Sequence, residues 1–210
     1  MAARAHSVDP RAERVRTRLR EAAFALAHER QVDEITVGDI VARAEVSRQV
    51  FYQHFRDRDD AVATAFTVAF AAATDMDCLD GTAVGNSPDA RARILRLFEF
   101  AAEHRSMYRN IVPSAVTQRV VTAFRAELQP ACEQIARQGM PVVSPIASLT
   151  PESVTRFLVG GFMEVLRSWM EDPDSTDLSG RVGAALDTVN ALLGLTTQSK
   201  GSHHAQSQQG

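Results

Sequence analysis

Polar side chains suited to reading DNA bases gather in the segment VSRQVFYQHF. Arg48, Gln49, Tyr52 and Gln53 fall on one side of a helix at 3.6 residues per turn. An arginine guanidinium can donate to O6 and N7 of guanine, and a glutamine amide can pair with N6 and N7 of adenine. Tyr52 and His54 suit phosphate oxygens. The segment therefore predicts a surface that contacts DNA, with a merely solvated helical face as the alternative.

Two short helices must position these side chains. The hydroxyl of Thr36 can accept a hydrogen bond from the first unpaired backbone amide of a helix. The side chain of Asp39, three residues later, can accept one from the backbone amide of Thr36, which completes a capping box. The first of the two helices should therefore begin near Val37. Ile40 and Ala44 lie four residues apart and should point into a small core.

The second helix follows after a turn through Glu45 and Val46. Ser47 is a strong N-cap because its hydroxyl can satisfy an unpaired backbone amide. Phe51 and Phe55 are again four residues apart and should join the core. A helix, a tight turn and a helix with an outward polar face together predict a helix-turn-helix.

The chain strongly resembles the TetR family of bacterial transcriptional repressors. The resemblance lies in EAAFALAHERQVDEITVGDIVARAEVSRQVFYQHFRDRDDAV, residues 21–62, above all in VSRQVFYQHF. It implies an all-α protein, with an N-terminal three-helix helix-turn-helix DNA-binding domain and a larger C-terminal helical domain for ligand binding and dimerisation. It further implies a repressor that binds a palindromic operator as a homodimer and is released by a small effector.

The chain departs from the family pattern at four positions. Gln31 and Glu45 stand where family members usually have glycine, so both turns are expected to be strained or differently built. Gly38 stands where a polar residue is common, which puts base contacts from the first short helix in doubt. Val50 replaces a common threonine and could pack on a thymine methyl group.

The candidate DNA-binding residues follow from the helix-turn-helix and its flanks. Arg58, just before the acidic start of the next helix, is expected to hold a phosphate. The full set is Thr36, Val37, Ser47, Arg48, Gln49, Val50, Tyr52, His54 and Arg58.

The net charge of the 210-residue chain is −3, but the charge is unevenly distributed. Residues 1–58 hold eleven arginines and nine acidic residues, whereas the remainder holds twelve basic and seventeen acidic residues. Six arginines lie within residues 4–20, and a basic N-terminal arm would be attracted to phosphates, although an ordinary solvated helix start is as good an interpretation.

The rest of the chain is also predicted to be helical, since no stretch alternates as a strand would. We expect a DNA-binding domain at 1–58, a regulatory ligand-binding and dimerisation domain at 59–198, and a disordered tail at 199–210. A long helical segment should run from Pro113 to about Gln138, with GMPVVSPIAS as the loop after it.

Two C-terminal helices are predicted to form the homodimer interface. Their apolar stripes are too extensive to face water, although they could instead fill the core of one subunit. The candidate dimerisation residues are Leu158, Val165, Trp169, Val182, Leu186, Val189 and Leu193.

The family resemblance also implies a small-molecule pocket in the larger domain, and aromatic and methionine side chains suit an apolar or aromatic effector. Most of these residues could equally be core. The candidate ligand-binding residues are Leu97, Phe98, Met107, Tyr108, Phe124, Phe157 and Phe162.

Other functions have less support. The chain has no nucleophile elbow, zinc-protease, P-loop or dinucleotide motif, so no catalytic residue, cofactor or metal is assigned. Cys78 and Cys132 have no metal spacing and are expected to be free thiols. Without an apolar run long enough for a signal peptide or membrane span, the expected location is cytoplasmic. A non-specific DNA-binding protein without a ligand is the alternative function.

Overall fold

The computed structural model describes residues 10–75, 90–112 and 114–195. Within these ranges every regular element is helical. Arg4, Cys78, Pro113 and the predicted tail lie outside the described residues. The other five arginines of residues 4–20 lie in the helix that begins at Pro10, as an ordinary helix start would have it.

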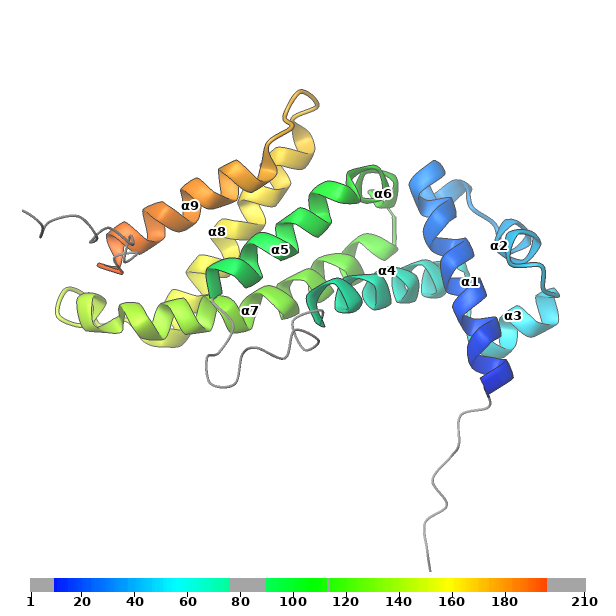
Figure 1. Ribbon diagram of the computed structural model, residues 1–210, viewed down its shortest axis with the longest axis horizontal. Helices are drawn as coiled ribbons and strands as arrows, with labels where there is room; N and C mark the ends of the chain where they lie inside the picture. The colour runs from blue at the N-terminus through cyan, green and yellow to red at the C-terminus, as the bar shows by residue number, and fades with distance from the viewer. Residues whose placement is uncertain (1–9, 76–89, 113, 196–210) are drawn as a thin grey trace, which may run out of the picture.

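Three helices form the head at one end of the molecule: α1 (Pro10–Glu29), α2 (Val37–Ala44) and α3 (Arg48–His54) (Figure 1). A short 3₁₀ turn, η1 (Val32–Glu34), joins α1 to α2. The core of the head is built from apolar side chains of all three helices, because each helix carries its apolar residues on one stripe. The fully buried members include Leu19, Ala23, Ile40 and Phe51.

Helix α4 (Arg58–Asp75) leads from the head into the larger domain (Figure 1). It packs against α1 of the head and against α5 and α7 of the larger domain. Phe66 and Phe70 of α4 are both buried, and their rings stack with centroids 5.5 Å apart. Helix α4 therefore belongs to the cores of both parts.

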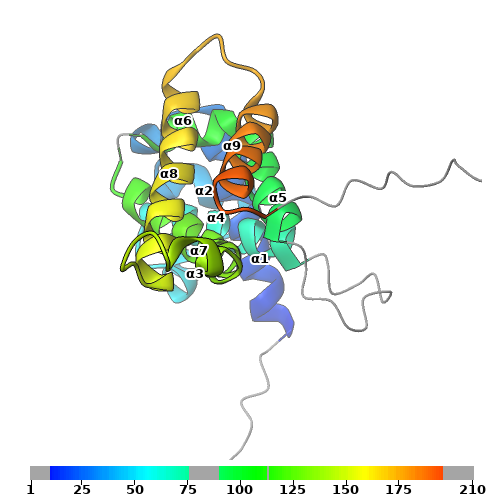
Figure 2. The same cartoon turned by 90° about the vertical axis from the view of Figure 1, so that its left-hand side faces the viewer.

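The larger domain consists of α5 (Ala90–Glu103), α6 (Arg105–Ile111), α7 (Val116–Val143), α8 (Pro151–Glu171) and α9 (Leu178–Leu192). Viewed end-on, α8 and α9 lie beside α5 and α7 (Figure 2). Thr150 caps α8 by accepting a hydrogen bond from the Ser153 amide at 3.2 Å, with Pro151 in the first turn. Among the described residues no helix is long and apolar enough to cross a membrane.

Helix α7 continues past the end predicted for it. The sequence predicts a loop from Gly139, yet the helix extends to Val143 and contains both Pro130 and Pro141. Gly139 is buried against Leu193, since a Cβ atom added at residue 139 would lie 2.8 Å from Cδ1 of that leucine. Tertiary packing therefore keeps the chain helical where the local sequence favours a break.

Candidate DNA-binding surface

The start of α2 is fixed by the predicted capping box. The Asp39 amide donates to Oγ1 of Thr36 at 3.1 Å, and the Thr36 amide donates to Oδ2 of Asp39 at 2.8 Å. Hydrogen bonds from Thr36, together with Arg30 3.1 Å away, lower the pKa of Asp39 to about 2. Because Arg30 follows α1, this carboxylate also ties α2 to the end of α1.

The two turns with unusual residues are built differently from each other. Glu45 ends α2 with a left-handed backbone at φ 51°, the conformation for which glycine is usual. Gln31 has φ −54° and ψ 135°, an ordinary conformation that leads into η1. The strain expected at Glu45 is therefore present, whereas the turn at Gln31 avoids it by adopting a different backbone.

Helix α3 presents the predicted polar face to solvent. Ser47 caps it by accepting a hydrogen bond from the Val50 amide at 3.3 Å, while Phe51 and Phe55 are buried beneath it. On the opposite side Tyr52 is 59% exposed. Arg48, Gln49 and Gln53 are also exposed, whereas Val50 and His54 are half-buried.

Arg58 has partners within the head. Its guanidinium donates to the carbonyl oxygens of Asp33 and Ile35 at 2.9 and 3.1 Å and contacts the carboxylate of Asp59 at 2.8 Å. These bonds hold the η1 turn against the start of α4. The arrangement favours a structural role for this residue over the predicted phosphate contact.

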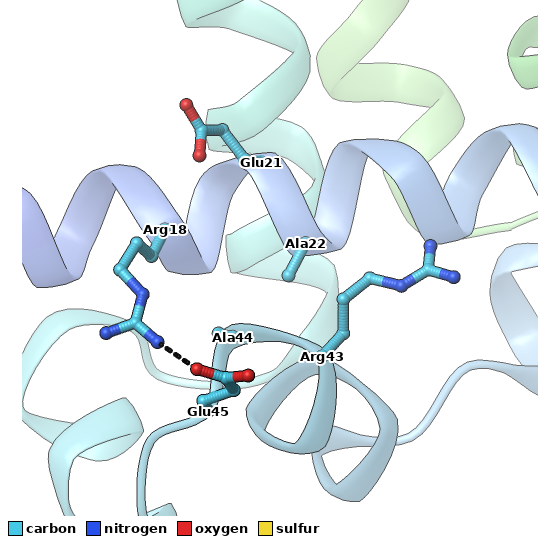
Figure 3. A pocket seen from close by; sticks show the side chains of 6 residues that line it. All are labelled: Arg18, Glu21, Ala22, Arg43, Ala44 and Glu45. Atoms are coloured by element: carbon cyan, nitrogen blue, oxygen red, sulfur yellow. Dashed lines mark hydrogen bonds and ion pairs between the residues drawn. The ribbon is translucent and has the colours of Figure 1, made fainter.

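A polar hollow lies between α1 and α2, lined by Arg18, Glu21, Ala22, Arg43, Ala44 and Glu45 (Figure 3). Its arginines are already paired: Arg18 lies 3.3 Å from Glu45, and Arg43 lies 2.7 Å from Glu29. The guanidiniums therefore serve to join the helices of the head.

The predicted effector residues divide into two groups. Leu97, Phe98, Met107, Tyr108, Phe124 and Phe162 are buried in the larger domain. Phe98 packs edge-on against Phe124 with ring centroids 5.3 Å apart. Phe157 is 79% exposed on α8, so its assignment to an internal pocket is wrong.

Most of the predicted dimerisation residues are core residues of a single chain. Leu158, Trp169, Val182 and Leu186 are at most 4% exposed, so they cannot reach a second subunit in this conformation. The apolar stripes of α8 and α9 instead pack inward, the alternative that the sequence left open. Val165, Val189 and Leu193 are half-buried at the edges of that packing.

A different face of α8 and α9 is open to solvent. Phe157 and Leu192 are 79% and 74% exposed, and a Cβ atom added at Gly160 or Gly161 would meet no atom within 4 Å. Small residues allow the backbone of a second helix to approach closely. Gly160 and Gly161 follow Phe157 by three and four residues, so the three fall on one face of a helix. This spacing in the sequence indicates the exposed face.

Within the described ranges, no cluster of three or more histidine, cysteine or acidic side chains could hold a metal ion. Cys132 is a free thiol, as predicted, and burial raises its pKa to about 12. Such a thiol is almost entirely protonated at neutral pH, which makes it a poor nucleophile.

Comparison with known proteins relates the head to one family. Residues 19–63 match the family of bacterial regulatory proteins described as the tetR family. No curated protein matches the chain in sequence.

Solved structures share the fold over most of the chain. The dihydroxyacetone kinase operon activator DhaS superposes with a TM-score of 0.63 at 16% identity, covering 86% of this chain and 97% of its own. A TetR transcriptional regulator from Streptococcus agalactiae gives 0.58 at 14% identity, covering 85% and 95%. FadR from Bacillus subtilis, in complex with stearoyl-CoA, gives 0.59 at 14% identity, covering 86% and 99%.

Proposed function

Because the chain is a transcriptional regulator of the TetR family, we propose that it controls its target genes by binding a partly palindromic operator as a homodimer. The observation that carries this proposal is the exposed polar face of α3 above the buried Phe51 and Phe55. Repression is the mode that the resemblance implies. A similar fold occurs in an operon activator, so the sign of regulation must be measured.

In this proposal Arg48 and Gln49 contact base edges in the major groove. Tyr52 and His54 contact the phosphate backbone, and these contacts contribute affinity but no sequence specificity. Thr36, Val37 and Ser47 lie at the helix starts that face the same groove, and Val50 packs on a thymine methyl group.

The homodimer would form through the exposed face of α8 and α9. Phe157 and Leu192 supply the apolar area, and Gly160 and Gly161 let the helices of two subunits approach. A head of three helices covers one half-site, so two subunits are needed to read an operator whose half-sites lie one helical turn apart.

The effector would be a small apolar or aromatic molecule that enters the core of the larger domain. Tyr108 supports this, because its hydroxyl is buried and makes no hydrogen bond to the described residues. An effector with one polar group could supply that bond. Burial raises the pKa of Tyr108, so the hydroxyl stays protonated and available as a donor.

Helix α4 would transmit the signal, since it packs on α1 as well as on α5 and α7. Arg119 of α7 lies 3.2 Å from Asp60 in the first turn of α4, which joins the larger domain to the base of the head. A shift of α4 would change the separation of the two recognition helices and weaken operator binding.

The test is to select bound fragments of the source genome with the purified protein and to measure binding of the recovered site at fixed salt. Arg48→Ala should lose about 1 to 3 kcal/mol and relax discrimination at one base pair per half-site. Tyr52→Phe should lower the affinity for all DNA sequences by a similar factor. Equal binding of the selected site and its scrambled version would instead favour the alternative function, a non-specific DNA-binding protein without a ligand.

A further inference from the structure

Helix α6 contacts the end of α1, so it connects the larger domain to the head in addition to α4. The Asn110 side-chain amide donates to the carbonyl oxygens of Ala27 and His28 at 3.0 and 3.2 Å. On its other side, α6 is tied to the end of α8 by Arg105, whose guanidinium lies 4.1 Å from the centre of the Trp169 ring. Helix α6 thus connects the end of α1 in the head to the end of α8 in the larger domain.

A pair of histidines crosses this contact. Nε2 of His28 on α1 lies 3.0 Å from Nδ1 of His104, the residue before α6. Nδ1 of His28 lies 2.9 Å from the carbonyl oxygen of Phe24. Because a carbonyl only accepts, Nδ1 of His28 must carry hydrogen, so in the neutral ring Nε2 is the acceptor for the N–H of His104.

Aromatic rings enclose the pair. The Phe24 ring lies edge-on to both histidines, with centroids 4.7 Å from His28 and 5.2 Å from His104, and the Phe100 ring lies 4.3 Å from His104. The histidines are half-buried, so protons can reach them from solvent. The hydrogen bond between the two imidazole rings therefore has apolar rings on two sides.

The charged neighbours are largely engaged elsewhere. On α1 and just beyond it, Glu29 pairs with Arg43, and Arg30 pairs with Asp39. On α4, Phe66 packs edge-on against Phe100, with ring centroids 6.0 Å apart. Glu103 at the end of α5 acts on His104, and Arg105, the next residue, has Arg109, Asp172 and Arg181 as charged neighbours.

We propose that His28 and His104 form an acid-sensitive junction that joins head and larger domain when both rings are neutral and opens when both are protonated. One proton is tolerated, because His104 can accept it at Nε2 and still donate from Nδ1. A second proton on Nε2 of His28 places two N–H groups face to face in an apolar surround.

The direction of the pH dependence follows from the environment of His104. Burial lowers its pKa, the charge of His28 lowers it further, and Glu103 opposes both. A histidine with a lowered folded-state pKa binds fewer protons in the folded state than in the unfolded chain. Its contribution to stability is therefore present above the ordinary value of about 6.5 and is lost as the pH falls below it.

Hydrogen exchange measures opening of the junction directly, without DNA or effector, so its outcome is independent of the proposed function. We expect exchange at residues 24–31 and 104–111, corrected for the intrinsic rate, to rise at least fivefold between pH 7.5 and 5.5. Exchange in α7 should change much less. His104→Gln removes one titrating ring, and its pH response should fall below twofold.

A matched control restores the number of histidines away from the junction. Gln118 is exposed on α7, so His104→Gln combined with Gln118→His should behave as His104→Gln alone. Recovery of the wild-type response in this double variant would show that histidine charge in general, rather than the junction, is responsible.

The wild-type protein also provides a test that needs no variant. In an NMR titration of the ring carbons, His28 and His104 should shift together in two linked steps, because each proton affects both rings. Independent single-step titrations of the two rings, or exchange at 24–31 that does not change with pH, would overturn the proposal.

Discussion

The guanidinium of Arg48 lies across the first turn of α2, directly over Gly38. A Cβ atom at residue 38 would be 3.0 Å from Nη2 of Arg48 and 3.3 Å from Oγ1 of Thr36. Glycine therefore leaves the space in which the first arginine of α3 rests. The departure from the family pattern at residue 38 and the arginine at residue 48 are parts of one arrangement.

Gly38→Ala should change stability and DNA binding in opposite directions. Alanine in a helix is more stable than glycine by about 0.5 to 1 kcal/mol, and the end of a flexible arginine can move aside. The midpoint of urea unfolding should rise, while discrimination at the base pair that Arg48 is proposed to contact should weaken. Unchanged base preference in a fully folded variant would show that Gly38 has no role in DNA recognition.

Glu45→Gly should stabilise the head. The left-handed backbone at φ 51° costs a residue with a side chain about 1 kcal/mol, which glycine avoids. The lost ion pair with Arg18 is exposed and should contribute little. Glu45→Ala is the control, because it removes the ion pair and keeps the strain. If alanine and glycine raise the unfolding midpoint equally, backbone strain is not the cause.

The sequence predicts the head far better than the larger domain, for a physical reason. Capping by Thr36 and Ser47 and the spacing of Phe51 and Phe55 are local features, and the structure confirms them. Which apolar stripe of α8 or α9 faces inward depends on helices distant in sequence. The contact of His28 with His104 spans 76 residues and has no local signal.

The exposed and buried faces of α8 and α9 can be separated by two substitutions. Phe157 is exposed, so Phe157→Glu should leave the unfolding midpoint nearly unchanged and convert the proposed dimer to a monomer in light scattering. Leu186 is fully buried, so Leu186→Ala should cost about 2 to 5 kcal/mol of stability and keep the dimer. A wild-type protein that is monomeric at micromolar concentration would contradict the dimer itself.

Gly139→Ala should destabilise the larger domain although alanine favours helices. The added methyl group would lie 2.8 and 2.9 Å from the two Cδ atoms of Leu193 and 3.1 Å from its Cβ, too close for the existing packing of α7 against the end of α9. Overpacking of this kind typically costs about 1 to 3 kcal/mol, more than the helix preference returns. Leu193→Ala removes both Cδ atoms but keeps Cβ, so Gly139→Ala should cost much less in that background than in the wild-type protein. Urea unfolding of the two single variants and the double variant measures this coupling, and strictly additive effects would show that residues 139 and 193 are not in contact in solution.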